Sequence, residues 1–186
     1  MNDATAAALS VRRTARRLHS ARDVARALDR MAKDLTPRLK RANPVVLAVM
    51  RGGVFAALEL CKRFKFPHEF EYVHATRYRG DTRGRDLEWR VRPSKALAGR
   101  TVLVVDDILD HGKTLRALNT ELERVGVAEV LSAVLVVKRL ARKRARPSAT
   151  VTGLEVDDVY VFGSGMDYRG YWRGLPGIYA VADGAA

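Results

Sequence analysis

Residues 101–118 of the chain read TVLVVDDILDHGKTLRAL, and this stretch decides the fold class. Residues 102–105, VLVV, form a short, branched apolar run, which is typical of a strand buried in a sheet. Asp106 and Asp107 follow this run directly, at the expected carboxyl end of the strand. The next stretch, KTLRALNTELERVG, predicts a helix that ends at Gly126. The order of strand, acidic pair and helix predicts a ligand site at the carboxyl edge of an open α/β sheet.

The turn between this strand and helix, residues 110–114 with the sequence DHGKT, has the composition of a phosphate site. Backbone N–H groups are free at a helix N-terminus, Gly112 allows close approach, and Thr114 adds a hydroxyl. Together with the acidic pair, the turn would hold both ends of a phosphorylated sugar. A nucleotide-triphosphate loop is excluded, because it needs a glycine five residues before Gly112, where Asp107 stands. The alternative is a solvated acidic pair beside an ordinary helix cap.

The rest of the chain alternates strands with helices. Helical spacing predicts a helix over residues 21–40, disturbed or ended near Pro37, and a second over residues 54–64. The Arg- and Ala-rich N-terminus is expected to be a helix or a frayed arm. Apolar or alternating patterns predict further strands at residues 45–50, 68–74, 87–91, 129–138, 156–163 and 177–181. This alternation indicates an α/β fold, with a mainly parallel sheet covered by helices on both faces.

Composition fits one compact domain. The chain has 186 residues, 47% of them hydrophobic, which predicts a single domain over residues 1–186 with a substantial core. No apolar run is long enough for a membrane span, and the N-terminus lacks the apolar stretch of a secretory signal. The single Cys61 cannot form an internal disulfide, is expected in the core, and fits a cytoplasmic location.

Four further segments accompany the acidic pair in an order that points to one family. Residues 102–115 closely resemble the phosphoribosyl-diphosphate signature of the type I phosphoribosyltransferases. VMRGGV resembles the pyrophosphate loop of the hypoxanthine-guanine branch, and HATRYRGDTRG resembles its flexible catalytic loop. VLVVKR and VYVFGSGMDYRGYWRGL resemble its purine-binding strand and its hood. The resemblance covers roughly residues 44–181. It implies a core of about residues 40–150, and a hood formed by the N-terminal segment and about residues 155–186.

The resemblance also implies an activity, in which ribose 5-phosphate passes from phosphoribosyl diphosphate to hypoxanthine or guanine with Mg²⁺ as cofactor. In that reading Asp106 and Asp107 hold the ribose hydroxyls and the metal, and Asp167 serves a second metal ion through water. The residues implied to bind phosphoribosyl diphosphate are Arg51, Gly52, Asp106, Asp107, Asp110, His111, Gly112, Lys113, Thr114 and Arg173.

The purine is implied to contact Lys138, Tyr160, Val161 and Asp167. Lys138 would donate to the 6-oxo group, Tyr160 would stack on the ring, and Val161 would offer backbone contacts. Two residues take catalytic roles by resemblance. Asp110 would exchange a proton with purine N7, and Tyr78 would close over the reacting centre.

Three positions depart from the family pattern. Arg51 stands where lysine is frequent, His111 replaces a common threonine, and Arg77 replaces the serine that usually precedes the tyrosine. The charge at position 51 survives with different geometry, whereas His111 gives up a hydroxyl contact. The resemblance also implies a cis peptide between Met50 and Arg51.

The net charge of +13 keeps a second reading open, that of an RNA-binding transcriptional regulator on the same fold. A basic background composition or a phosphate-rich substrate explains the charge better, and the purine-site residues count against the regulator, so nucleic acid is not expected as a partner. The run 139–146 is expected to be a solvated loop. Neutralising Arg142, Lys143, Arg144 and Arg146 together should then leave catalytic efficiency nearly unchanged. A xanthine preference also stays open, and a homodimer or homotetramer is implied.

Overall fold

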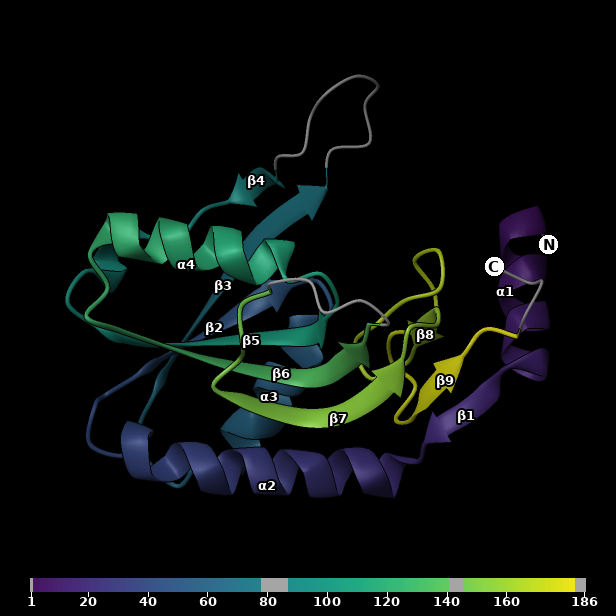
Figure 1. The fold of residues 1–186 in the computed structure, drawn as a ribbon, viewed down its shortest axis with the longest axis horizontal. Coiled ribbons are helices and arrows are strands. Elements are labelled where there is room, and N and C mark those ends of the chain that lie inside the picture. Colours follow the sequence, from purple (N-terminus) through teal and green to yellow (C-terminus); the bar gives the residue numbers. More distant parts are fainter. Residues whose placement is uncertain (1, 78–86, 141–145, 183–186) are drawn as a thin grey trace.

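The computed structural model describes residues 2–77, 87–140 and 146–182, and a six-stranded sheet forms its centre (Figure 1). Across the sheet the strands are ordered β4-β3-β2-β5-β6-β7. All neighbours are parallel except the pair β3 and β4. The strands are β2 (Val45–Met50), β3 (Glu69–Arg77), β4 (Leu87–Val91), β5 (Thr101–Leu109), β6 (Glu129–Arg139) and β7 (Val151–Asp157). The mainly parallel sheet predicted from the alternation of elements is confirmed.

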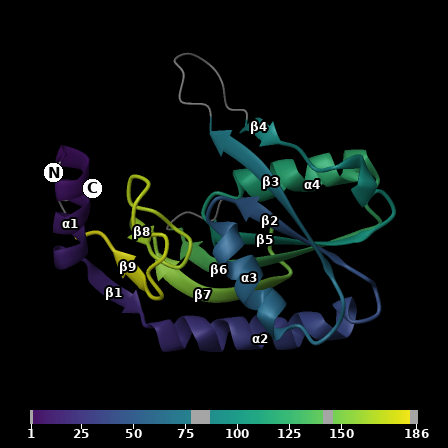
Figure 2. The same cartoon turned by 180° about the vertical axis from the view of Figure 1, so that it is seen from behind.

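Helices cover both faces of this sheet (Figures 1 and 2). On one face lie α2 (Ala21–Leu39) and α3 (Gly53–Arg63), and on the other lie α4 (Lys113–Val125) and a short 3₁₀ turn, η1 (Lys95–Leu97). Ser20 caps α2 in a reciprocal capping box with Asp23. The helix continues past Pro37, which lies in its last turn, where few backbone bonds remain to be broken.

The central strand β5 is longer than its apolar run. It includes Asp106 and Asp107, which were expected to follow the strand. Its pairing with β2 ends at Val105, whereas its pairing with β6 continues to Leu109. One neighbouring strand therefore keeps the acidic pair in extended backbone. On the other side of β5 the sheet is open at these two residues.

A second, three-stranded sheet joins the two ends of the chain. Its order is β1-β9-β8, all antiparallel, and its strands are β1 (Arg16–His19), β9 (Ile178–Ala180) and β8 (Val161–Phe162). Helix α1 (Asp3–Thr14) packs beside it, where the Trp172 indole donates to the carbonyl of Ala8 at 2.7 Å. This small sheet lies next to the carboxyl ends of β5, β6 and β7 (Figure 1), as expected for a hood.

Three expectations were wrong in detail. Residues 156–163 are not one strand, because the chain turns after Asp157 and enters the small sheet at Val161. Neither β1 nor the first half of β7 was predicted, since both are short and half-exposed and lack a clear apolar pattern. Cys61 is half-buried at the edge of the core, where burial raises the pKa of its thiol to about 11.

Among the described residues, no helix is both long and apolar enough to cross a bilayer.

Candidate active site

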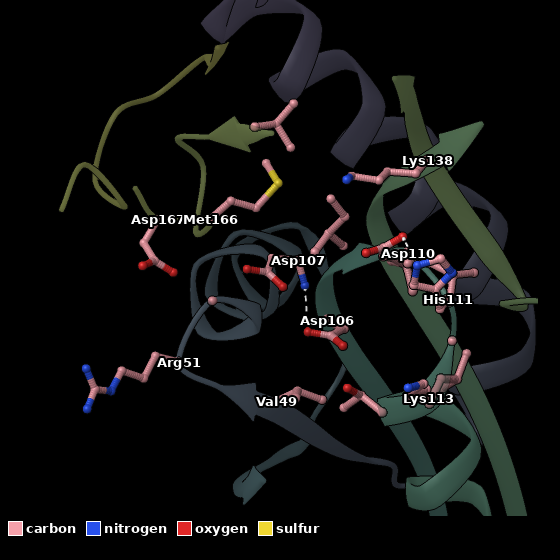
Figure 3. A pocket seen from close by; sticks show the side chains of 18 of the residues that line it. Val49, Arg51, Asp106, Asp107, Asp110, His111, Lys113, Lys138, Met166 and Asp167 are labelled. Carbon is pink, nitrogen blue, oxygen red and sulfur yellow. Dashed lines mark hydrogen bonds and ion pairs between the residues drawn. The ribbon is translucent and has the colours of Figure 1, made fainter. Parts of the chain in front are cut away.

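A pocket of about 430 Å³ opens at the carboxyl ends of β2, β5 and β6 (Figure 3). Every predicted site residue in the described ranges lines it. From the main sheet and its loops these are Arg51, Gly52, Asp106, Asp107, Asp110, His111, Gly112, Lys113, Thr114 and Lys138, and from the hood Tyr160, Val161, Asp167 and Arg173. Tyr78 and most of the expected catalytic loop lie outside the described residues. Residues from four separate stretches of the sequence thus meet in one pocket.

The pocket also has apolar walls that the sequence did not reveal. They include Val49, Ala75, Ile108, Val134 and Met166. An apolar side chain next to a strand end has no signal that separates a pocket wall from ordinary core packing. Ile108 and Met166 had a hint in the sequence, since each is next to a predicted site residue, Asp107 and Asp167 respectively.

The acidic pair occupies the floor of the pocket. The backbone N–H of Asp107 donates to Oδ1 of Asp106 at 2.9 Å, and the two carboxyl groups also interact with each other. Burial, and next the negative charge of Asp107, raise the pKa of Asp106 well above its ordinary value. Burial also raises the pKa of Asp107, although a hydrogen bond between its side chain and that of Asp106, and the charge of Arg173, oppose that shift. The site therefore favours any cation or hydrogen-bond donor that relieves the repulsion.

The loop at Arg51 and Gly52 packs directly against this pair. A Cβ at Gly52 would lie 1.6 Å from Oδ2 of Asp107, so only glycine allows this approach. On its other side the loop touches Gly165, where a Cβ would lie 2.4 Å from the carbonyl of Gly52. The Met50–Arg51 peptide is cis, as expected. The Arg51 side chain is exposed and extends away from the acidic pair (Figure 3).

The predicted phosphate turn forms the adjoining wall and the start of α4. Gly112 caps the helix in left-handed backbone with a φ of +71°, and no side-chain hydrogen bond caps it in the described structure. The first N–H groups of the helix are therefore available to an anion. Oδ1 of Asp110 is buried and accepts no hydrogen bond from the described residues, and Nε2 of His111 lies 3.7 Å from it.

The end of β6 and the hood carry the residues expected to bind a base. The side chain of Lys138 is only 15% exposed, and its Nζ lies 3.1 Å from Oδ1 of Asp158. Tyr160 is 41% exposed and tilts against Tyr168, with ring centroids 5.8 Å apart. One face of the hood thus places an accessible aromatic ring near a nearly buried ammonium group.

Arg173 and Asp167 form an ion pair at the hood edge of the pocket. Nη2 of Arg173 lies 2.5 Å from Oδ1 of Asp167, and its Nη1 donates to the carbonyl of Gly165 at 2.7 Å. The other carboxylate oxygen of Asp167 accepts from the N–H of Gly170. Arg173 is therefore oriented by the hood, and both Asp167 oxygens already have partners.

Arg146 corrects the expectation of a solvated basic loop. It is half-buried, and its Nη1 donates to the carbonyls of Asp110 and Lys138 at 2.9 Å each, with that of Leu109 at 3.3 Å. Its place in a run of arginines and lysines concealed this role, because the local sequence is the same as that of a solvated loop. Residues 141–145 lie outside the described ranges.

Known proteins resemble this chain in both sequence and fold. Residues 14–169 match the family model of the phosphoribosyl transferase domain. A hypoxanthine-guanine-xanthine phosphoribosyltransferase of Tritrichomonas foetus is 29% identical over 161 residues, which cover 87% of this chain and 88% of the relative. A hypoxanthine-guanine phosphoribosyltransferase of Lactococcus lactis is 32% identical over 144 residues, 76% of this chain and 77% of the relative.

Among solved structures, a hypoxanthine phosphoribosyltransferase of Staphylococcus aureus matches with a TM-score of 0.82 at 24% identity, over 90% of this chain and 91% of its own. That likeness concerns the fold, whereas the family model and the Lactococcus relative concern the sequence over most of the chain. The chain therefore belongs to the type I phosphoribosyltransferases, in the branch of the hypoxanthine-guanine enzymes.

Proposed function

We propose that this enzyme transfers ribose 5-phosphate from phosphoribosyl diphosphate to hypoxanthine or guanine, giving IMP or GMP and pyrophosphate. The observation that carries the proposal is a single pocket holding an acidic pair, a helix N-terminus and a nearly buried lysine. These three features suit the ribose hydroxyls, the 5-phosphate and a purine oxo group, respectively. The names of the two relatives agree with this assignment.

Mg²⁺ fits the acidic pair. Asp106 and Asp107 hold their charges at a cost, as their raised pKa values show, and a divalent cation would remove that cost. Among the described residues, no three His, Cys, Asp or Glu side chains are placed to hold a metal ion by themselves, which suits an ion that keeps waters and takes ligand oxygens from its substrate. When bound, Mg²⁺ would neutralise charge on the pyrophosphate. Asp167 would take part through water only.

The chain's own residues would divide the remaining work. The bond between the anomeric carbon and the pyrophosphate oxygen breaks as the bond to the purine nitrogen forms. Arg173, and Arg51 after its side chain turns inward, would stabilise the negative charge of the leaving pyrophosphate. Asp110 would exchange the proton at purine N7, and Lys138 would donate to the 6-oxo group. The loop around Tyr78 would exclude water, which competes for the same carbon.

The test is a product assay with purified enzyme and phosphoribosyl diphosphate. Hypoxanthine, guanine, xanthine and adenine are supplied one at a time, with Mg²⁺ or with EDTA. We expect nucleotide and pyrophosphate from hypoxanthine and guanine, little from adenine, and none with EDTA. Turnover of xanthine that is faster than that of hypoxanthine and guanine would contradict the proposed preference. The name of the Tritrichomonas relative includes xanthine. Turnover of no purine, with nanomolar RNA binding that weakens with salt, would instead establish the regulator.

We also propose that the enzyme is a cytoplasmic homodimer or homotetramer, built as one domain with the small sheet as its hood. The single cysteine and the pairing of β1 with β9 support the location and the domain. Light scattering coupled to size exclusion would give the oligomer number. A monomer at assay concentration would contradict the proposed oligomeric state.

A further inference from the structure

The guanidinium of Arg146 contacts two parts of the pocket that lie far apart in the sequence. Its Nη1 donates to the carbonyls of Asp110 and Leu109, which lead into the phosphate turn, at 2.9 and 3.3 Å. The same nitrogen donates at 2.9 Å to the carbonyl of Lys138, the residue expected to read the purine. One group therefore joins the end of β5 to the end of the neighbouring strand β6, where both border the pocket.

The residue after Arg146 supports the same turn from behind. A Cβ at Gly112 would lie 2.7 Å from Cδ of Pro147 and 3.3 Å from Cβ of Arg146. The turn thus lies close to the side chains of this segment as well as being hydrogen-bonded to it. A residue larger than glycine would have no room at position 112.

The charge of Arg146 is not used in an ion pair within the described structure. No described carboxylate lies within ion-pair distance of it, and its Nη1 bonds are to neutral carbonyls. A charged donor makes stronger hydrogen bonds to carbonyls than a neutral one does. The arrangement suits a residue whose task is to hold backbone in place.

We propose that Arg146 is a positioning residue that sets the phosphate turn and Lys138 at a fixed separation, so that both ends of the nucleotide are held together. The inference rests on the proposed function, because it assigns the turn to the 5-phosphate and Lys138 to the base. A displacement of about 1 Å at either end can cost on the order of a hundredfold in rate, so this tie matters although Arg146 touches neither end of the substrate itself.

The first test compares Arg146→Met with Arg139→Met. Arg139 is the matched control, because it lies on β6 beside Lys138 but is 62% exposed and pairs with Asp157. We expect Arg146→Met to raise KM by about tenfold or more for both phosphoribosyl diphosphate and hypoxanthine. Arg139→Met should leave both values nearly unchanged. If Arg146→Met lowers only the thermal midpoint and leaves both KM values unchanged, the residue is structural and the proposal is wrong.

The second test uses the fact that all three bonds come from one nitrogen. Nη1 of arginine has two N–H groups shared among three carbonyls, and the ammonium group of lysine has three, so Arg146→Lys should recover most of the substrate affinity that Arg146→Met loses. A lysine variant as impaired as the methionine variant would overturn the donor role. If Arg146 acts through Lys138, Lys138→Ala should lower catalytic efficiency less in the Arg146→Met variant than in wild type. Fully additive losses would contradict that link.

A binding measurement separates this inference from the proposed function. Ribose 5-phosphate is titrated calorimetrically into wild type and Arg146→Met, without purine or Mg²⁺. Binding weakened about tenfold by Arg146→Met would support the role at the turn even if no purine were a substrate. Equal binding by the two proteins would overturn it even in an enzyme that turns over hypoxanthine as proposed.

Discussion

At the scale of single residues, the buried oxygen Oδ1 of Asp110 is the feature that best supports a proton-transfer role. Oδ1 accepts no hydrogen bond from the described chain, although a buried carboxylate oxygen ordinarily has a donor. A purine N–H would supply one. We expect Asp110→Asn to lower turnover by roughly 10²–10⁴-fold while substrate binding changes little, since the amide cannot exchange a proton. Steady-state kinetics with hypoxanthine and calorimetry with IMP would measure the two effects. Wild-type turnover in the variant would remove Asp110 from the proton transfer.

Lys138 is expected to discriminate between purines. Its ammonium group is nearly buried, so a bond to a 6-oxo group should be worth about 1.5–3 kcal/mol. Lys138→Ala should therefore lower efficiency with hypoxanthine and guanine by roughly ten- to a hundredfold. Adenine has an amino group at this position, which accepts no hydrogen bond from the lysine, so the efficiency with adenine should fall much less. An equal loss with all three purines would mean that Lys138 supports the fold rather than the choice of base.

At the scale of elements, the loop between β2 and α3 depends on Gly52. An added Cβ would collide with Oδ2 of Asp107, whereas a Cβ at Gly174 in the hood would meet nothing within 4 Å. We expect Gly52→Ala to lower the free energy of unfolding by about 1–3 kcal/mol, because loop and acidic pair must separate. It should also weaken binding of phosphoribosyl diphosphate.

Gly174→Ala is the matched control for this loop and should change neither property. Urea unfolding gives the stability, and a titration of phosphoribosyl diphosphate gives the affinity. Two alanine variants that behave alike in both measurements would show that the close contact at Gly52 is not needed.

At the scale of the whole molecule, the acidic pair makes stability depend on pH. Burial and repulsion raise the pKa of Asp106, so the folded protein holds a proton there that the unfolded chain releases at about pH 4. The free energy of unfolding should therefore fall as pH rises from about 4 through the raised pKa. Asp106→Asn removes this contribution and should be more stable than wild type near neutral pH, without metal ions.

Thermal unfolding between pH 4 and 8 would measure this difference. Asp34→Asn on α2 is a control, because it removes one carboxylate at an exposed position outside the pocket. If the difference in thermal midpoint between Asp106→Asn and wild type does not increase with rising pH, the proposed repulsion is wrong. Addition of Mg²⁺ with phosphoribosyl diphosphate should stabilise wild type more than Asp106→Asn.

The features that could be predicted from the sequence are those that depend on near neighbours in the chain. The apolar run before Asp106, the glycine and hydroxyl of the following turn, and the spacing of the helix to Gly126 all act within a few residues of each other. Such local preferences predict elements and their order, and parallel strands then bring their carboxyl ends to one edge. The acidic pair and the phosphate turn could be predicted on that basis.

Tertiary structure decided the contacts that join distant segments. The tie from Arg146 to the carbonyl of Leu109 spans 37 positions, and β1 pairs with β9 at the opposite end of the chain. The local sequence of Arg146 is that of a solvated basic loop, and that of β1 is a short polar stretch. Their roles come from partners that only the folded chain brings near, because hydrogen bonding and burial depend on distance in space and not on distance in sequence.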